Sequence, residues 1–184
     1  HVQFEKNSMV NRNKIISNQQ EQMLTIPLKT KGKFGSLEIN SVEVADNVNW
    51  RSKHYRSIQQ AYSKARFKDK VLEGLVKLYD TNSELALGPI LRSNLDIFLE
   101  LLALKDTTIM HSSEMECSGS NSDLILNICR DLKATSYISG PFGRQYLDED
   151  KFAASGIDVI YHDYEHPTYM QSGPNFISHM STLD

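Results

Sequence analysis

The sequence predicts an α/β fold, with a Rossmann-like, mostly parallel sheet, a helical central section and a small antiparallel ribbon. Three observations support this prediction. Short apolar runs alternate with helical patterns beyond residue 105, which is typical of βαβ units. The middle of the chain carries three successive helical patterns, and two strand-like runs flank a Lys/Gly turn before them. With 184 residues, we expect a single α/β domain over residues 1–184.

Composition excludes several classes of protein. The chain has 20 basic and 23 acidic residues, so no positive excess favours DNA or RNA, and we expect no nucleic-acid partner. The most apolar stretch, residues 90–104, is interrupted by Arg92, Asp96 and Glu100, so we expect no membrane span. Two cysteines are too few for a secreted disulfide scaffold, which favours a cytoplasmic protein. They and the scattered histidines predict no metal site, and no cofactor is assigned.

Strand patterns come first along the chain. We expect strands over residues 23–28 and 36–44, because the second run alternates apolar and polar residues, and the pair is predicted to form the antiparallel ribbon. Asn49 is expected to cap a helix over residues 50–65. A second helix is predicted over residues 68–79, where the apolar residues have helical spacing.

The third predicted helix begins at Asn82 or Ser83 and runs to Leu104. Since proline removes a backbone donor, we expect a kink or break at Gly88–Pro89. In the remaining part we expect strands over residues 107–110, 136–139 and 157–161, and helices over residues 123–132 and 149–154.

The common catalytic signatures are absent from the sequence, and three polar groups remain as candidates for a site. The first is Asn11, Arg12 and Asn13. A guanidinium can hold a phosphate or carboxylate through two parallel hydrogen bonds, and amides suit ligand hydroxyls. The alternative is an ordinary solvated segment.

The second group, Lys53 and His54, lies in the first turn of the helix predicted to follow Asn49. Unpaired amides in a first helical turn favour anions, and a cation nearby strengthens that preference. His54 is a candidate acid or base because the ordinary pKa of imidazole is near neutrality. The alternative is a histidine that only packs within the helix.

The third group follows two predicted strands. In a parallel sheet the carboxyl ends of the strands meet at one edge, where α/β proteins bind ligands, so we expect these side chains to lie together. The alternative is a tyrosine-rich loop without a ligand. The residues are Gly140, Arg144 and Tyr146 after the first strand, and His166, Tyr169 and Gln171 after the second.

Taken in order, these stretches resemble the WbqC-like family of bacterial proteins, over nearly the whole chain. Members of that family begin with a strand and a Gln-Pro-containing loop, so we expect an amino-terminal strand and loop to precede residue 1. The matching segments are Val2–Lys6 with Asn11–Asn13, Trp50–Tyr55 with Ile58 and Tyr62, Ile128–Cys129 with Leu132, Tyr137–Gly140 with Arg144 and Tyr146–Asp148, His166–Pro167 with Tyr169 and Gln171, and Ser181–Asp184.

This resemblance implies a role in the synthesis of bacterial surface polysaccharide, such as O-antigen. The leading hypothesis is a transferase that acts on a nucleotide-linked or amino sugar as its small-molecule substrate, with acyl or aminoacyl transfer to the sugar amine. His54 or His166 would accept the amine proton. The remaining roles are anion binding by Arg12, Lys53 and Arg144, hydroxyl binding by Asn11, Asn13 and Gln171, and further substrate contacts by Gly140, Tyr146 and Tyr169.

Two alternatives stay open from the sequence. In the first, the protein is a magnesium-dependent nucleotidyltransferase-like enzyme, whose basic residues and glycine turn hold a nucleoside triphosphate. In the second, it is a non-catalytic ligand-binding or scaffold protein of the same pathway. A requirement for magnesium distinguishes the first alternative, and a complete absence of turnover distinguishes the second.

Overall fold

The computed structural model describes residues 3–32, 37–45, 48–80 and 85–184. The chain divides into two compact units, one formed by residues 1–108 and 167–184 and the other by residues 109–166. We call them unit 1 and unit 2. The single domain expected over the whole chain stays a prediction.

Unit 1 contains a β-hairpin made of β1 (Arg12–Ser17) and β2 (Gln20–Thr25), paired antiparallel with Arg12 opposite Thr25. Asn18 and Gln19 form its two-residue turn, and both have left-handed backbone angles, with φ of 51° and 63°. Such turns match the natural twist of two antiparallel strands. A local turn therefore closes the hairpin. It lies earlier in the chain than the ribbon that was predicted from residues 23–28 and 36–44.

The ribbon predicted from residues 23–28 and 36–44 is wrong in its partners. Among the described residues, these segments share one isolated antiparallel bridge, Leu28 with Val44, and Ile39–Ser41 forms a short 3-10 helix. The first segment instead contributes the end of β2, because β1 lies closer along the chain and pairs with it at a small entropy cost.

Three helices follow in unit 1: α1 (Trp50–Ala61), α2 (Lys68–Asp80) and α3 (Leu87–Leu101). The Asn49 cap is confirmed, since its side-chain oxygen accepts a hydrogen bond from the Ser52 amide at 3.4 Å. The first helix ends four residues before its predicted end, where turns lead into α2. The second helix is confirmed to within one residue.

A kink or break was predicted at Gly88–Pro89, but the interruption lies just before it: Leu85 and Ala86 are not helical, and α3 begins at Leu87 and continues through both residues. Pro89 is the third residue of α3, and the amides of a first helical turn have no acceptor within the helix, so a proline there removes no bond. The predicted start at Asn82 or Ser83 lies outside the described residues.

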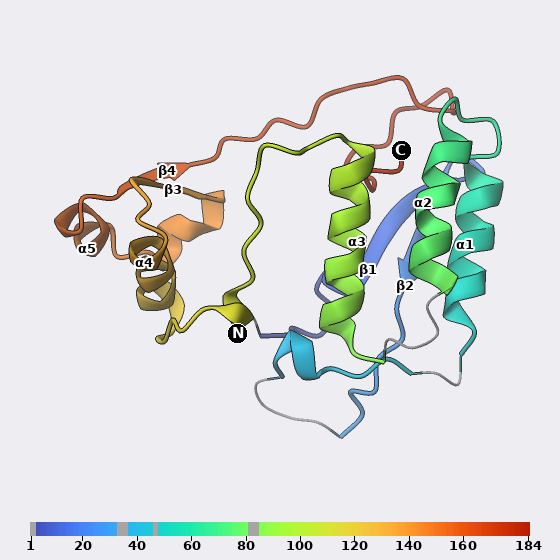
Figure 1. Cartoon of the computed structure of the whole chain (residues 1–184). Coiled ribbons are helices and arrows are strands. Elements are labelled where there is room, and N and C mark those ends of the chain that lie inside the picture. The colour runs from blue at the N-terminus through green and yellow to red at the C-terminus, as the bar shows by residue number, and fades with distance from the viewer. Residues whose placement is uncertain (1–2, 33–36, 46–47, 81–84) are drawn as a thin grey trace. The chain divides into compact units, whose positions relative to one another are not determined.

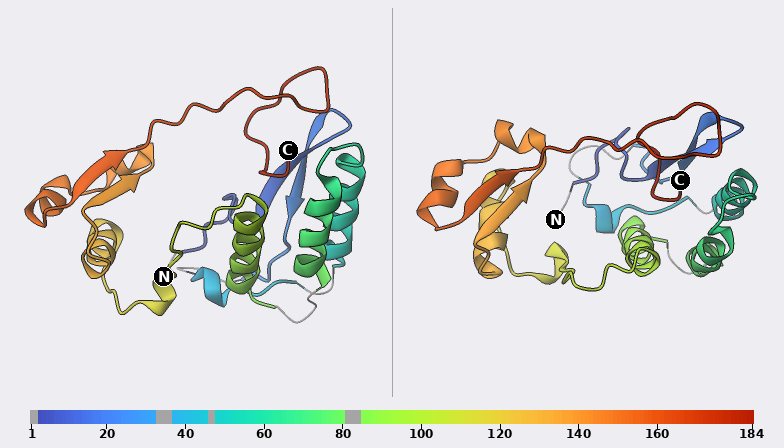
Figure 2. Two further views of the ribbon diagram at one scale, coloured as in Figure 1. Left: turned by 45° about the horizontal axis from the view of Figure 1, so that its top comes forward. Right: turned by 90° about the horizontal axis from the view of Figure 1, so that it is seen from above.

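The three helices lie side by side on one face of the hairpin, as two layers with a shared core (Figure 1 and Figure 2). Apolar side chains from both layers and from the connecting segments fill the space between them. Its most deeply buried members are Ile15, Val42, Val44, Ile58, Leu75 and Leu87.

Unit 2 contains a parallel pair of strands, β3 (Ser136–Ser139) and β4 (Asp158–Tyr161). The connection between them carries α5 (Glu149–Ala154), and α4 (Asn121–Asp131) precedes them. These elements confirm the predicted βαβ unit. A separate small core joins them, formed by Leu126, Cys129, Phe152 and Ile157.

Other parts of the predicted sheet are not found. Residues 107–110 have no regular structure, and their side chains are exposed, so no sheet face covers them as a strand would require. The described residues thus form a mixed α/β fold with one antiparallel and one parallel pair of strands. The Rossmann-like arrangement is not confirmed. In the described part of the chain, no helix has the length and apolar character needed to cross a membrane.

Candidate ligand-binding site

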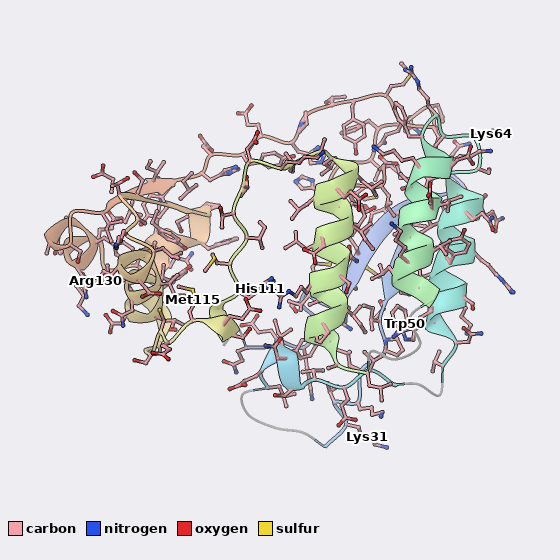
Figure 3. The ribbon with its side chains drawn as sticks, viewed as in Figure 1. Lys31, Trp50, Lys64, His111, Met115 and Arg130 are labelled. Carbon is pink, nitrogen blue, oxygen red and sulfur yellow. The ribbon has the colours of Figure 1, made fainter. Side chains whose placement is uncertain are left out.

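A cavity of about 410 Å³ lies in unit 1 between the hairpin and the three helices. Helical spacing places Trp50, His54 and Ile58 on the cavity-facing side of α1, with Trp50 at its first turn (Figure 3). The segment Ser181–Leu183 forms another wall and is attached to β1, because the Ser181 amide donates to the Lys14 carbonyl at 2.9 Å. We call this space the first cavity. Its apolar surface comes mainly from Ile15, Leu24, Ile26, Leu75, Leu78, Ile90, Leu91, Leu95 and Phe98.

Asn11, Arg12 and Asn13 all line the first cavity, as expected of a shared site. The Asn11 side chain is buried, and its Nδ2 donates to the Ile26 carbonyl at 2.8 Å. Its Oδ1, and the Nε of Arg12, are buried without a hydrogen-bond partner in the described residues. Leaving a buried polar atom unpaired costs about 1–3 kcal/mol, so such atoms call for a partner. Both residues line the first cavity.

His54 lies at the same cavity and is 9% exposed. Its Nε2 lies 3.1 Å from the Thr25 carbonyl oxygen. A carbonyl only accepts hydrogen bonds, so Nε2 carries the proton and Nδ1 carries a lone pair. Burial lowers the pKa of His54 from its usual 6.5 to about 4, and the bond to Thr25 opposes this only in part. His54 is therefore neutral at physiological pH and can accept a proton at Nδ1.

Aromatic rings fix the orientation of the His54 side chain. Its ring centroid lies 5.1 Å from that of Trp50 and 6.1 Å from that of Tyr79, both in edge-to-face geometry. The Arg51 guanidinium lies 4.5 Å above the Trp50 ring. Burial raises the pKa of Tyr79 to about 12, partly offset by Arg51, so its hydroxyl stays protonated. This packing, together with the bond to Thr25, holds the imidazole in one position.

Lys53 does not join the first cavity. Its side chain is exposed, and it is absent from the residues that line the space. Adjacent residues on a helix point about 100° apart, so the neighbour of a cavity-facing histidine points elsewhere. Anion binding by Lys53 stays a prediction.

Tyr169 and Gln171 hold the end of the chain in place. Gln171 Nε2 donates to Asp184 at 2.6 Å and to the Ile177 carbonyl at 2.8 Å, while its Oε1 accepts from the Ile177 amide at 2.7 Å. The Tyr169 hydroxyl donates to the same carboxylate at 3.0 Å. These contacts anchor the segment that carries Ser181–Leu183 to the first cavity. The predicted substrate contacts of Tyr169 and Gln171 stay untested.

The other predicted site residues belong to unit 2. At the carboxyl ends of β3 and β4, the Arg144 guanidinium lies 3.9 Å from the centre of the Tyr161 ring. Tyr146 is exposed, and the His166 ring contacts Tyr164 with centroids 5.9 Å apart. Nothing crowds Gly140, where a side chain would meet open space. The substrate-binding roles of Gly140, Arg144 and Tyr146 and the catalytic role of His166 stay predictions.

Sequence reasoning missed several residues that line the first cavity: Tyr79, Asn94, Ser181 and Thr182. Of these, only Asn94 could have been suspected from the sequence, because it is a polar residue within an apolar stretch that forms much of α3. The others depend on tertiary packing. In the described part of the chain, no group of three or more His, Cys, Asp or Glu side chains is arranged to hold a metal ion.

Comparison with known proteins agrees with the resemblance found in the sequence. The model of the WbqC-like protein family matches residues 1–184. The uncharacterized protein Rv1507c of Mycobacterium tuberculosis (strain ATCC 25618 / H37Rv) is 29% identical over 184 residues, which cover all of this chain and 78% of that protein. No solved structure matches the chain. Because the family model covers its whole length, the chain belongs to the WbqC-like protein family.

Proposed function

We propose that the protein is a transferase of bacterial surface-polysaccharide precursor synthesis, which moves an acyl or aminoacyl group to the amine of a nucleotide-linked or amino sugar. The pathway rests on the family resemblance. The chemistry rests on the first cavity, and above all on one observation: the buried, unpaired Asn11 Oδ1 and Arg12 Nε at its wall.

The apolar floor of the first cavity supports the acyl group as the part that is bound there. A volume of about 410 Å³ lies within the range of small-molecule sites, roughly 300–1,000 Å³. A sugar ring buried against Leu75, Leu78 and Ile90 would leave hydroxyls unpaired, which is costly. An acyl chain or an apolar aminoacyl side chain gains free energy from the same surface.

The polar atoms at the wall match the reacting group. The acyl carbonyl oxygen would accept a hydrogen bond from Arg12 Nε, and the amine of the sugar would donate to Asn11 Oδ1. As the tetrahedral intermediate forms, negative charge develops on that carbonyl oxygen, and a fixed cationic donor stabilises it. Arg12 therefore has the part of an oxyanion donor in this proposal.

His54 would handle the proton. With a thioester as donor, the sugar nitrogen bonds to the acyl carbon and the carbon–sulfur bond breaks. The amine proton passes to His54 Nδ1 and then to the departing thiolate, so the products are an amide and a thiol. With a pKa of about 4, His54 is a weak base, so it takes the proton only after the nitrogen has bonded to carbon and become cationic, and it then releases the proton readily. Lys53, Arg144 and His166 carry no step in this scheme.

The test is product formation. The full chain is incubated with acetyl, butyryl and octanoyl thioesters and with amino sugars, free or nucleotide-linked, and the amide is detected by mass spectrometry. Arg12→Lys keeps the charge but loses the planar donor group, so we expect kcat to fall about 10²-fold. Arg56→Ala, an exposed change on α1 outside the first cavity, is the matched control and leaves turnover unchanged.

Two results would contradict the proposal. One is full turnover by the Arg12→Lys variant. The other is the absence of amide from every donor and acceptor pair, together with pyrophosphate release from a nucleoside triphosphate that depends on magnesium. That second result would favour the nucleotidyltransferase alternative.

A further inference from the structure

A second cavity, of about 440 Å³, lies in unit 1 at the turn between α1 and α2. Lys64 belongs to this turn and lies at the opposite end of α1 from Trp50 (Figure 3). Ile58 and Leu183 line both cavities, so the two spaces share a wall. Gln171, which the sequence predicted to bind sugar hydroxyls, also lines the second cavity, whereas Asn11, Arg12 and His54 do not.

Three positively charged side chains line the second cavity. Lys64, Arg66 and Lys68 all line the second cavity, and none of them forms an ion pair within the described residues. Lys68 Nζ donates to the Ser63 carbonyl at 3.0 Å, which leaves its charge uncompensated. Three positively charged side chains that line one cavity favour an anionic ligand.

One carboxylate, that of Asp184, also lines the second cavity. Its two oxygens already accept hydrogen bonds, one from the Tyr62 hydroxyl at 3.4 Å and the other from Tyr169 and Gln171. Asp184 therefore offsets one of the three positive charges, but its carboxylate oxygens are already occupied by hydrogen bonds from the protein itself. The side chains that line the second cavity therefore keep a net positive charge.

Two unusually exposed apolar side chains complete the second cavity. Phe67 is 64% exposed and Met170 is 95% exposed, and both line the space. The Arg66 guanidinium lies 5.1 Å from the centre of the Phe67 ring. A flat aromatic ring beside an arginine suits stacking of a planar base, and a methionine thioether contacts such rings favourably.

We propose that the second cavity binds a nucleoside diphosphate, with the base between Phe67 and Met170 and the phosphates at Lys64 and Arg66. A volume of about 440 Å³ lies within the range of small-molecule sites. The inference rests on the proposed function in one respect: the nucleotide would be the carrier of the acceptor sugar.

Direct binding tests the proposal without any transfer reaction. UDP and ADP are titrated calorimetrically into the full chain, beside pyrophosphate, uridine and vesicles that contain phosphatidylglycerol. We expect both nucleotides to bind more tightly than pyrophosphate or uridine. Lys64→Ala and Arg66→Ala are each expected to weaken binding about fivefold, and Phe67→Ala about tenfold.

Lys77→Ala is the matched control, because Lys77 is an exposed lysine of α2 that does not line the second cavity. Since Lys64, Arg66 and Phe67 are exposed, their replacement is expected to leave the melting temperature unchanged. Unchanged nucleotide affinity in the Lys64→Ala/Arg66→Ala double variant would overturn the proposal. So would binding of pyrophosphate as tight as that of UDP, or binding to the vesicles alone. Nucleotide binding without amide formation would uphold this inference while contradicting the transferase.

Discussion

His54 illustrates how burial sets the protonation state of a single residue. The sequence suggested a histidine that titrates near neutrality, but its position between the hairpin and α1 removes it from water and lowers its pKa to about 4. The Thr25 carbonyl selects the tautomer with the proton on Nε2. The residue is thus a neutral imidazole with a lone pair on Nδ1 at physiological pH.

The lowered pKa predicts how stability changes with pH. Between pH 6.5 and pH 4 the unfolded chain binds a proton at His54 that the folded chain does not, so the free energy of unfolding falls as the pH falls. From pH 7.5 to pH 5 we expect a loss of about 2 kcal/mol from this residue. Urea denaturation of the wild type and of His54→Gln, which cannot titrate, measures the difference. Equal pH dependence in the two proteins would show that His54 is not buried as described.

Gln171 is the central residue of the network around Asp184, because its side chain forms hydrogen bonds with Tyr169, Ile177 and Asp184. Gln171→Glu would replace a donor by a second carboxylate beside Asp184. We expect a loss of about 2 kcal/mol in unfolding free energy at pH 7.5, and a smaller loss at pH 4, where carboxylates are protonated. Gln60→Glu, an exposed change on α1, is the control in the same denaturation experiment. A loss of stability that is independent of pH would contradict a clash between two carboxylates.

At the scale of secondary-structure elements, α1 depends on its first turn. Asn49 accepts from the Ser52 amide, and no acidic residue lies in that turn to compensate for its loss. We expect Asn49→Ala to cost about 1 kcal/mol, whereas Asn49→Asp keeps the acceptor and costs little. The shift in the urea midpoint measures both. Equal losses in the two variants would mean that the cap is not what stabilises this end.

Local patterns predicted those elements whose signals are contained in a few adjacent residues. The bounds of α2, β3 and α5 were predicted to within one residue from the spacing of apolar residues, and the start of α1 was predicted from its cap, Asn49. β1 was missed because the run Arg12–Ser17 reads as a continuation of an amide-rich loop. Its status as a strand depends on pairing with β2 through the turn at Asn18 and Gln19, which is a matter of backbone geometry.

For the candidate site, several residues could be predicted from the sequence, but the cavity that they line could not. Asn11, Arg12, Asn13 and His54 were singled out by chemistry, and packing brings them to one cavity. The cavity itself was not predictable, since its walls come from both strands, three helices and the last residues of the chain. Lys53 lies outside the first cavity because an adjacent position on a helix faces another direction, and its predicted anion binding is untested.

At the scale of the whole molecule, the chain contains two separate hydrophobic cores, one in each compact unit. Phe152 is fully buried in the core of unit 2, and Leu87 in that of unit 1. Truncating a buried phenylalanine to alanine costs about 3–5 kcal/mol through lost contacts and a cavity. We therefore expect Phe152→Ala to speed amide hydrogen exchange mainly in residues 109–166, and Leu87→Ala mainly in the other unit. Uniform acceleration across the chain by both variants would contradict two separate cores.

The affinity of the first cavity for acyl thioesters of different length is the most direct test of its role as the acyl-binding site. Each buried methylene contributes about 0.8 kcal/mol, so the wild type should bind a butyryl thioester about tenfold more tightly than the acetyl thioester. Leu95 lines the first cavity and is 43% exposed, so Leu95→Trp can fill the space from the solvent side; Leu102→Trp is the matched change outside it. We predict that Leu95→Trp removes the preference for butyryl and that Leu102→Trp retains it. The same affinities in all three proteins, or no binding of either thioester to the wild type, would contradict the assignment of this cavity to the acyl group.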